Sequence, residues 1–149
     1  MPAVYQTVRK QENKIKQVKN KRVLIVDDDQ DILRLMEALL ESEGYDIIKA
    51  EDGSYALEKT ILEKPDLILL DIDMPNVNGF EVLERVKDNP ATKRIPIIML
   101  TASSESHSFE EAVEKKVDRY IAKPFDTKFL MQKIEEVMEE YEKKYGSGS

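Results

Sequence analysis

The centre of the chain reads DLILLDIDMPNVNG over residues 66–79. The apolar run from Leu67 to Leu70 is unbroken and of strand length, which is typical of a strand buried on both faces of a parallel sheet. Asp71 ends the run, and a loop with Met, Pro, Asn and Gly separates it from a helical pattern that begins near Gly79. The stretch therefore predicts a strand, a loop and a helix, with a carboxylate at the carboxyl end of the strand.

The same alternation continues on both sides of this stretch. We expect strands over residues 23–26, 45–50, 66–71, 96–101 and 117–122, and helices up to Gly44 and over residues 53–64, 79–88, 109–116 and 127–145. Five strand–helix units predict an α/β fold, a doubly wound five-stranded parallel sheet with helices on both faces, because each parallel connection needs a crossover. In the first helix, we expect a core-facing stripe of Ile32, Leu35, Met36 and Leu39.

Length and composition favour one domain in a reducing compartment. The chain has 149 residues and no cysteine, so we expect a single core without disulfides and exclude a multidomain enzyme. Residues 1–22 carry seven basic residues and one acidic residue, which leaves the remainder strongly acidic and repulsive toward DNA and anionic lipid. No apolar run is long enough for a membrane span, and the start lacks the pattern of a secretory signal. We therefore expect a cytoplasmic protein.

Both ends differ from the middle of the chain. Residues 1–20 form a basic extension whose apolar residues recur at steps of three and four, as in a short helix or coiled coil. A frayed leader and a contact with anionic membrane are the alternatives. Residues 21–145 form the predicted domain, and residues 146–149, Gly-Ser-Gly-Ser, are typical of a flexible linker or an engineered scar.

Polar side chains stand at the carboxyl ends of four predicted strands. They are Asp27, Asp28, Asp71, Thr101 and Lys123. In an open parallel sheet these ends meet at one edge, where ligands bind at the point at which strand order reverses. Carboxylates gathered there repel one another by about 4 kcal/mol for a pair about 4 Å apart at an effective dielectric near 20, so a positive charge must offset them. Each aspartate alone also fits a helix cap, and we expect Asp29 or Asp31 to cap the first helix.

This set of side chains suits phosphoryl chemistry. Hard oxygen ligands in small number favour Mg²⁺, with Mn²⁺ as an alternative, over Zn²⁺, because the chain has no cysteine and a single histidine, His107. Lys123 supplies a positive charge and Thr101 a hydroxyl donor for an anion. An aspartate flanked by a divalent ion, a lysine and a threonine is arranged as a nucleophile toward phosphorus. The predicted chemistry is formation of an aspartyl phosphate.

Four stretches, VLIVDDD, DLILLDIDMPNVNG, IPIIMLTA and YIAKPF, stand in an order and spacing that resemble the receiver domains of two-component response regulators. The resemblance covers residues 21–145 and is to single-domain regulators of the chemotaxis type. It implies a flavodoxin-like (βα)5 fold with strand order 2-1-3-4-5. It also implies a regulatory phosphoacceptor rather than an enzyme, one that reacts with small donors and dephosphorylates itself.

The resemblance assigns roles to residues around the predicted edge. Asp71 is the implied phosphoacceptor, receiving its group from a histidine kinase or a histidine phosphotransfer protein. The implied metal ligands are Asp27, Asp28, Asp71 and the main-chain carbonyl of Asp73, with Asp27 acting through water. Thr101 and Lys123 match the phosphoryl-binding positions.

Further positions match the switch and the loops of the family. Tyr120 matches the aromatic switch, while Pro75, Gly79 and Pro124 match structural loop positions, with a cis bond expected before Pro124. Output is expected through protein contacts of the fourth helix, the fifth strand and the last helix. No nucleic acid is expected to bind the domain, and the oligomeric state is left open.

Two positions depart from the common pattern of receivers. Asp73 places a carboxylate beside the phosphoryl position, where it can orient water, repel the phosphate or remain a solvated loop side chain. Lys116 replaces a glycine that ends the fourth helix in many receivers. A left-handed cap there would cost about 1 kcal/mol or more, unless the helix ends differently.

Two other functions fit parts of the sequence. Asp71-Ile72-Asp73 also matches the DxD motif of haloacid-dehalogenase-type phosphatases, which use Mg²⁺, a threonine and a lysine. That motif belongs on the first strand of its fold, however, and Pro75 occupies the place of its usual Thr or Val. Turnover of a generic phosphatase substrate separates the two functions. A receiver kept only as a scaffold is the other alternative, and the complete set of site residues argues against it.

Overall fold

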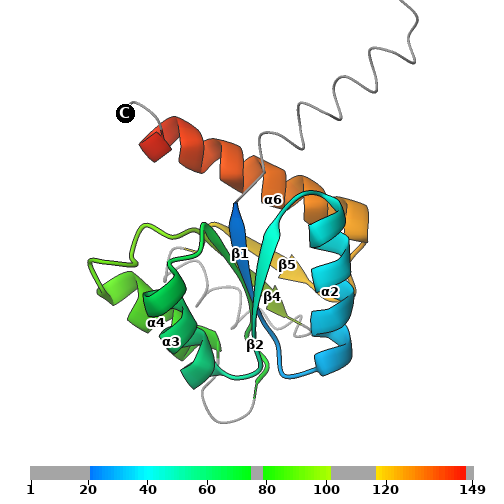
Figure 1. The fold of residues 1–149 in the computed structure, drawn as a ribbon, viewed down its shortest axis with the longest axis horizontal. Helices are drawn as coiled ribbons and strands as arrows, with labels where there is room; N and C mark the ends of the chain where they lie inside the picture. The colour runs from blue at the N-terminus through cyan, green and yellow to red at the C-terminus, as the bar shows by residue number, and fades with distance from the viewer. Residues whose placement is uncertain (1–20, 75–78, 102–116, 147–149) are drawn as a thin grey trace, which may run out of the picture.

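Five parallel strands form one sheet in the order β2-β1-β3-β4-β5 (Figure 1). The computed structural model describes residues 21–74, 79–101 and 117–146. The strands are β1 (Arg22–Val26), β2 (Asp46–Ala50), β3 (Leu67–Asp71), β4 (Ile97–Thr101) and β5 (Arg119–Ala122). The predicted α/β fold and the strand order implied by the resemblance are both confirmed.

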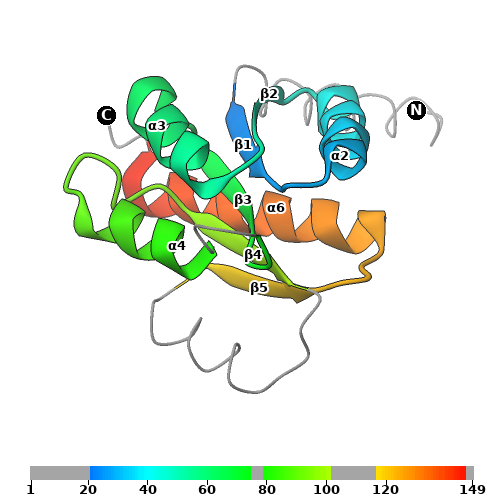
Figure 2. The same ribbon diagram turned by 90° about the horizontal axis from the view of Figure 1, so that it is seen from below.

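Helices cover both faces of the sheet (Figure 2). They are α2 (Gln30–Ser42), α3 (Gly53–Glu63), α4 (Gly79–Asp88) and α6 (Thr127–Tyr141), followed by a π-helical turn, η1 (Glu142–Gly146). Side chains from α2 and α6 supply one core, and side chains from α3 and α4 supply the other. Because successive strand residues point to opposite faces, Val23 and Ile25 join the first core while Leu24 and Val26 join the second.

The middle of the sheet is the most deeply buried part of the molecule. All five residues of β3 and all five of β4 are buried. Full burial of one Leu or Ile side chain contributes roughly 1.5–3 kcal/mol, so these strands are held firmly in place. Their polar last residues, Asp71 and Thr101, are buried with them. The apolar runs thus fix the positions of the functional candidates that follow them.

The ends of the helices follow local signals in the sequence. Asp29 caps α2 by accepting hydrogen bonds from the amides of Asp31 and Ile32, which confirms the predicted cap. Gly44 follows the end of α2 with a φ of 99°, a left-handed conformation that suits glycine. Lys64 ends α3 in the same region, with a φ of 46°, just before Pro65.

Some predicted boundaries and one predicted core face were wrong. The second strand begins at Asp46, because the amide of Tyr45 instead bonds the Leu40 carbonyl at the end of α2. In α2 the buried residues are Leu33, Met36 and Leu40, whereas Leu35 is 56% exposed. The core-facing stripe is therefore rotated away from Leu35, since the helix turns 100° per residue and residues 33, 36 and 40 form one narrow face.

Several predictions fall outside the described residues. These are the basic extension over residues 1–20, Pro75, His107, the helix over residues 109–116 with Lys116, and the last three residues. Within the residues that the structure describes, no helix is both long enough and apolar enough to cross a bilayer.

Candidate functional site

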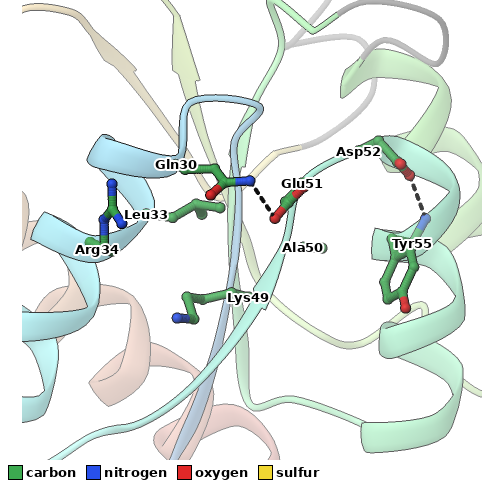
Figure 3. A pocket seen from close by; sticks show the side chains of 8 residues that line it. All are labelled: Gln30, Leu33, Arg34, Lys49, Ala50, Glu51, Asp52 and Tyr55. Atoms are coloured by element: carbon green, nitrogen blue, oxygen red, sulfur yellow. Dashed lines mark hydrogen bonds between the residues drawn. The ribbon is translucent and has the colours of Figure 1, made fainter.

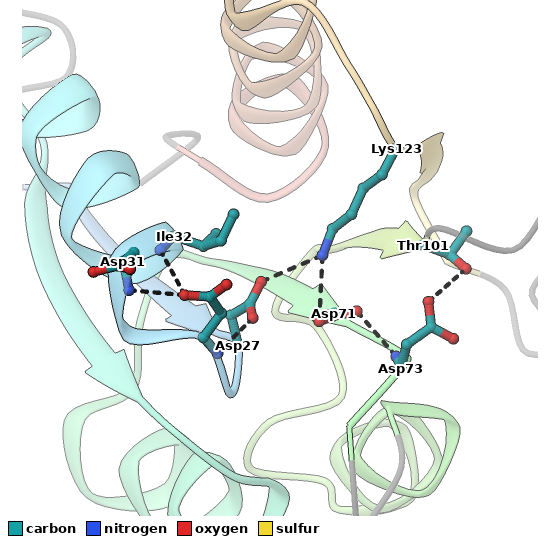
Figure 4. A network of polar contacts seen from close by, with 8 residues as sticks. Asp27, Asp31, Ile32, Asp71, Asp73, Thr101 and Lys123 are labelled. Atoms are coloured by element: carbon teal, nitrogen blue, oxygen red, sulfur yellow. Dashed lines mark hydrogen bonds and ion pairs between the residues drawn. The ribbon is translucent and has the colours of Figure 1, made fainter.

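Part of the predicted site meets at the carboxyl edge of the sheet, where Figure 4 shows Asp27, Asp71, Asp73, Thr101 and Lys123. Asp27 follows β1, Asp71 closes β3 and Thr101 closes β4; their exposed fractions are 3%, 3% and 0%. Lys123 follows β5, and its amide bonds the Thr101 carbonyl at 2.6 Å. Parallel pairing of β1, β3, β4 and β5 therefore brings residues almost 100 positions apart in the chain into one cluster.

Lys123 lies between two buried carboxylates. Its Nζ is 3.4 Å from Asp27 Oδ2 and 3.3 Å from Asp71 Oδ2. The second oxygen of each carboxylate accepts a main-chain amide two residues further on, from Asp29 to Asp27 and from Asp73 to Asp71, at 2.9 Å in both cases. Both carboxylates are thus oriented by short loops that continue their strands.

Burial and like charge disturb the ionisation of this cluster. Burial raises the pKa of the Asp27 carboxyl, opposed by the Asp29 amide and the Lys123 charge, and the neighbouring Asp71 adds to the rise. Burial alone would lower the pKa of Lys123, but the charges of Asp27 and Asp71 outweigh it and the pKa is raised. The ammonium group is therefore held in its charged form by its two carboxylate neighbours.

One lysine does not balance the negative charge of the cluster. Asp28 is exposed, and one carboxylate oxygen from each of Asp27, Asp28 and Asp71 lies within 4.8 Å of the others. A set of carboxylate oxygens without cysteine or histidine suits a hard divalent cation such as Mg²⁺, which retains several waters of its own. The donor set therefore fits the predicted metal.

The loop after β3 brings two further predicted residues into place. The Asp73 side chain reaches Thr101, whose Oγ1 donates to Asp73 Oδ2 at 3.2 Å. Gly79 starts α4 directly against this loop: a Cβ added there would lie 2.5 Å from the Cα of Ile72 and 2.9 Å from the Asp71 carbonyl oxygen. Glycine is required at position 79 by this close approach.

The switch candidate lies nearby but outside the charged cluster. Tyr120 is half-buried in β5, paired in register with Met99 of β4, and packs against the core beneath α3 and α4. The peptide bond between Lys123 and Pro124 is cis, as predicted. Of the predicted site residues, only Pro75 lies outside the part of the chain that the structure describes.

The contact between Asp73 and Thr101 is the feature of the site that the sequence did not predict. The sequence placed both residues at the edge, but no spacing signal indicates that their side chains meet. The bond depends on how the loop after β3 turns toward the end of β4, where the amide of Ile72 bonds the Leu100 carbonyl at 3.1 Å.

A separate hollow of about 540 Å³ lies beside β2, between α2 and α3 (Figure 3). Its polar side chains already have partners: Gln30 donates to Glu51 at 2.9 Å, and Asp52 accepts the amide of Tyr55 at 2.8 Å. Arg34 and Lys49 pair with acidic side chains of α2. None of the lining residues belongs to the acidic cluster, and we assign no ligand to this hollow.

Comparison with known proteins identifies the family. The model of the response regulator receiver domain matches residues 23–135. The chain is also 34% identical to a CheY-like response regulator receiver domain protein from Methanospirillum hungatei, with a TM-score of 0.80 over 85% of this chain and 99% of that one. The chain belongs to the response regulator receiver domain family. In this fold Asp71 closes the third strand of the sheet, whereas the DxD motif of the phosphatases belongs on the first.

Other relatives place the domain in two settings. The chemotaxis protein CheY4 of Vibrio cholerae is 30% identical, with a TM-score of 0.75 over 79% of this chain and 98% of that one. The alkaline phosphatase synthesis transcriptional regulatory protein PhoP of Bacillus subtilis is 38% identical over 80% of this chain and 49% of its own length. The chain thus spans about half the length of curated relatives of the second kind.

Proposed function

We propose that Asp71 accepts a phosphoryl group from a phosphohistidine on a sensor histidine kinase or a histidine phosphotransfer protein. The observation that carries this proposal is the environment of the Asp71 carboxylate. It is almost fully buried, lies 3.3 Å from Lys123 and clusters with the carboxylates of Asp27 and Asp28. This buried aspartate has two negative neighbours and one positive neighbour. Such an environment does not favour the fold, but it suits a carboxylate that binds a cation and reacts with an electrophile.

The proposed step is a displacement at phosphorus. An oxygen of Asp71 attacks the phosphorus atom, and the P–N bond to the donor imidazole breaks, with its electron pair left on that nitrogen. Lys123 stabilises the charge of the transferred oxygens from one side, and the Thr101 hydroxyl donates to them from the other. Because these groups come from the ends of β3, β4 and β5, the sheet holds them in place before the donor arrives.

We further propose that Mg²⁺ is held by Asp28, Asp71 and the main-chain carbonyl of Asp73, with Asp27 acting through water, and that Mn²⁺ can replace it. When bound, the ion neutralises the carboxylates and shields the charge of an approaching phosphoryl oxygen. Asp27 and Asp71 are already oriented for this task by the amides of Asp29 and Asp73.

The proposed donor contact lies on α2, which begins directly after the acidic cluster. Ile32 is half-buried in the first turn of this helix, and Leu35 is 56% exposed on its outer face. A partner helix laid against these side chains would bring a phosphohistidine close to Asp71. Ile32→Ala should therefore slow transfer from a kinase more than transfer from acetyl phosphate.

The proposed output surface combines the helix expected over residues 109–116 with β5 and α6. Within the described part, β5 and α6 are joined by Arg119, which contacts Glu140 at 2.5 Å and Glu136 at 3.7 Å. Drawing the Thr101 hydroxyl toward the phosphoryl group would open space for Tyr120 to rotate, which changes this surface for a cytoplasmic protein partner.

The experiment that tests the proposal is incubation of the chain with acetyl phosphate, followed by intact mass measurement and peptide mapping. With Mg²⁺ present, we expect one added phosphoryl group, on the peptide that contains Asp71. With the metal removed by EDTA, the label should be absent, and it should return when Mg²⁺ is restored. A label on another residue, or equal labelling without metal, would contradict the proposal.

A further inference from the structure

Asp73 contacts both residues on which the proposed chemistry depends. Its amide donates to Asp71 Oδ1 at 2.9 Å, and its carboxylate accepts the Thr101 hydroxyl hydrogen bond at 3.2 Å. The two partners differ in exposure: Thr101 is fully buried, whereas Asp73 is exposed in the loop after β3. The acceptor is therefore open to solvent, whereas the donor is enclosed at the end of β4.

The Thr101 hydroxyl cannot serve two acceptors at once. A hydroxyl carries one hydrogen, and an ionised carboxylate can only accept. While Thr101 donates to Asp73, it has no hydrogen for a phosphoryl oxygen on Asp71. An ionised carboxylate is a better acceptor than a neutral oxygen, so Asp73 competes for this hydrogen even at a donor–acceptor distance of 3.2 Å.

From this geometry we infer that Asp73 is a positioning residue that retains the Thr101 hydroxyl in the unphosphorylated protein and competes with the phosphoryl group for it. The inference rests on the proposed function of Asp71 and Thr101. Phosphorylation must then exchange the bond from Thr101 to Asp73 for a bond from Thr101 to the phosphoryl group. A phosphoryl group needs the Thr101 hydroxyl to be released, and only a fraction of the molecules are in that released state. The apparent affinity is reduced by this fraction, so Asp73 lowers the apparent affinity of the site for a phosphoryl group.

A simple repulsion between the Asp73 carboxylate and the phosphoryl charge would also weaken binding, but by a different route. Repulsion depends on the charge alone, while the proposed competition depends on an oxygen acceptor within reach of Thr101. Asp73→Asn removes the charge and keeps an acceptor oxygen, and Asp73→Ala removes both. Thr101→Val keeps the shape of residue 101 and removes the hydroxyl.

The test measures the dissociation constant of beryllofluoride, a non-covalent mimic of a phosphoryl group, at fixed Mg²⁺ concentration. We expect Asp73→Ala to bind it about tenfold more tightly than the parent chain and Asp73→Asn only about twofold, because a neutral acceptor retains part of the bond. In a Thr101→Val background the gain from Asp73→Ala should vanish, as a double-mutant cycle requires for a direct interaction. Asp31→Asn, which removes an exposed carboxylate on α2, serves as the charge control and should change nothing.

A second readout needs no metal or fluoride. In the free protein, Asp73→Ala should shift the Thr101 methyl NMR resonance, and Asp73→Asn should shift it less. Equal gains in the Asn and Ala variants, or a gain that persists with Thr101→Val, would overturn the competition. Failure of the parent chain to bind beryllofluoride would overturn the proposed function together with this inference, whereas normal binding with unchanged variants would overturn the inference alone.

Discussion

The two edges of the sheet both carry aspartates, and they use them in opposite ways. At the amino edge, Asp66 and Asp118 each precede a strand and exchange main-chain bonds with a neighbour. The Asp66 carboxylate accepts the Arg22 amide at 2.8 Å, and the Asp118 carboxylate accepts the Ile97 amide at 2.7 Å. At the carboxyl edge, Asp27 and Asp71 accept amides only within their own loops and then face each other across Lys123.

Two half-buried lysines show what this difference does to charge. Lys87, near the amino edge, lies 4.0 Å from the Asp118 carboxylate and also bonds the Ile95 carbonyl at 3.1 Å. Burial lowers its pKa, and Asp118 only partly opposes the change. Lys123 has two carboxylates within 3.4 Å, and these raise its pKa despite burial. Lys87 thus faces a single carboxylate, whereas at the carboxyl edge three clustered carboxylates outnumber Lys123 and leave negative charge that a cation can neutralise.

The largest expected difference is between the two ends of β3. Asp71→Asn should abolish uptake of a phosphoryl group, because an amide oxygen is a far weaker nucleophile than a carboxylate. Asp66→Asn makes the same chemical change at the opposite end and keeps an acceptor for the Arg22 amide, so labelling should continue. Intact mass after treatment with acetyl phosphate and Mg²⁺ measures both variants. Labelling of Asp71→Asn at the level of the parent would contradict the assignment of the phosphoacceptor to the carboxyl edge.

The next effect concerns the cation. Mg²⁺ at a hundred times its dissociation constant should stabilise the parent chain by about 2.7 kcal/mol, since it binds only the folded state. Asp28→Ala should lose most of this gain, because it removes a direct carboxylate ligand. Asp46→Ala, on the exposed start of β2, is the control at the amino edge and should respond to Mg²⁺ as the parent does. Thermal unfolding with and without Mg²⁺ measures the shift, and an undiminished response in Asp28→Ala would refute the ligand assignment.

Gly79→Ala should reveal how tightly the carboxyl edge is built. A Cβ at this position meets the main chain of Ile72 and the Asp71 carbonyl, which cannot give way as a flexible side chain can. We expect a loss of about 1–3 kcal/mol in the free energy of unfolding, as for other overpacked sites, and a lower rate of labelling at Asp71. Urea unfolding gives the first quantity. Wild-type stability together with wild-type labelling would show that the loop after β3 adapts freely.

Asp27→Asn should stabilise the metal-free protein by on the order of 1 kcal/mol, since it removes a buried charge next to another carboxylate. The sign follows from the pKa of Asp27, which is raised above its ordinary value of 3.8 in the folded state. The unfolded chain releases this proton first, so the stability of the parent falls relative to the variant as pH rises from 3.8 through the folded pKa. Unfolding free energies of parent and variant, measured across this range in EDTA, should diverge; a constant difference would show that folding does not raise the pKa of Asp27.

The smallest effect is expected from Tyr45→Phe, at the residue that directly precedes β2. The Tyr45 hydroxyl is buried, and within the described residues it has no hydrogen-bond partner. Burial raises its pKa, and the nearby Glu135 and Glu43 add to the rise. Removing the hydroxyl should leave the stability unchanged or raise it by up to about 1 kcal/mol. Loss of more than that in a urea titration would indicate a polar partner at the amino edge.

The fold could be predicted because its signals are local. The apolar runs of β1, β3 and β4 are unbroken, whereas a strand exposed on one face would alternate apolar and polar residues. Gly44 and Pro65 mark where helices stop. The convergence of Asp27, Asp71 and Lys123 follows from parallel topology, in which all carboxyl ends share one edge. The sequence alone therefore located most of the candidate site.

The remaining details depend on packing between segments far apart in the chain. Seven apolar residues in α2 left its buried face ambiguous, and contact with the sheet selected Leu33, Met36 and Leu40 over Leu35. The left-handed cap at Lys64 could not be foreseen from a lysine. The bond between Thr101 and Asp73 links the ends of two strands through the turn of a loop, which no periodicity encodes.

The carboxyl edge, and not the amino edge, is expected to carry an excess of negative charge that a divalent cation neutralises. A Mg²⁺ titration followed by amide NMR shifts of the whole chain tests it most directly. We predict saturable shifts at Asp27, Asp28, Asp71 and Asp73, with none at the amino-edge pairs of Asp66 with Arg22 and Asp118 with Ile97. Shifts confined to the amino edge, or no saturable shift at all, would contradict the account.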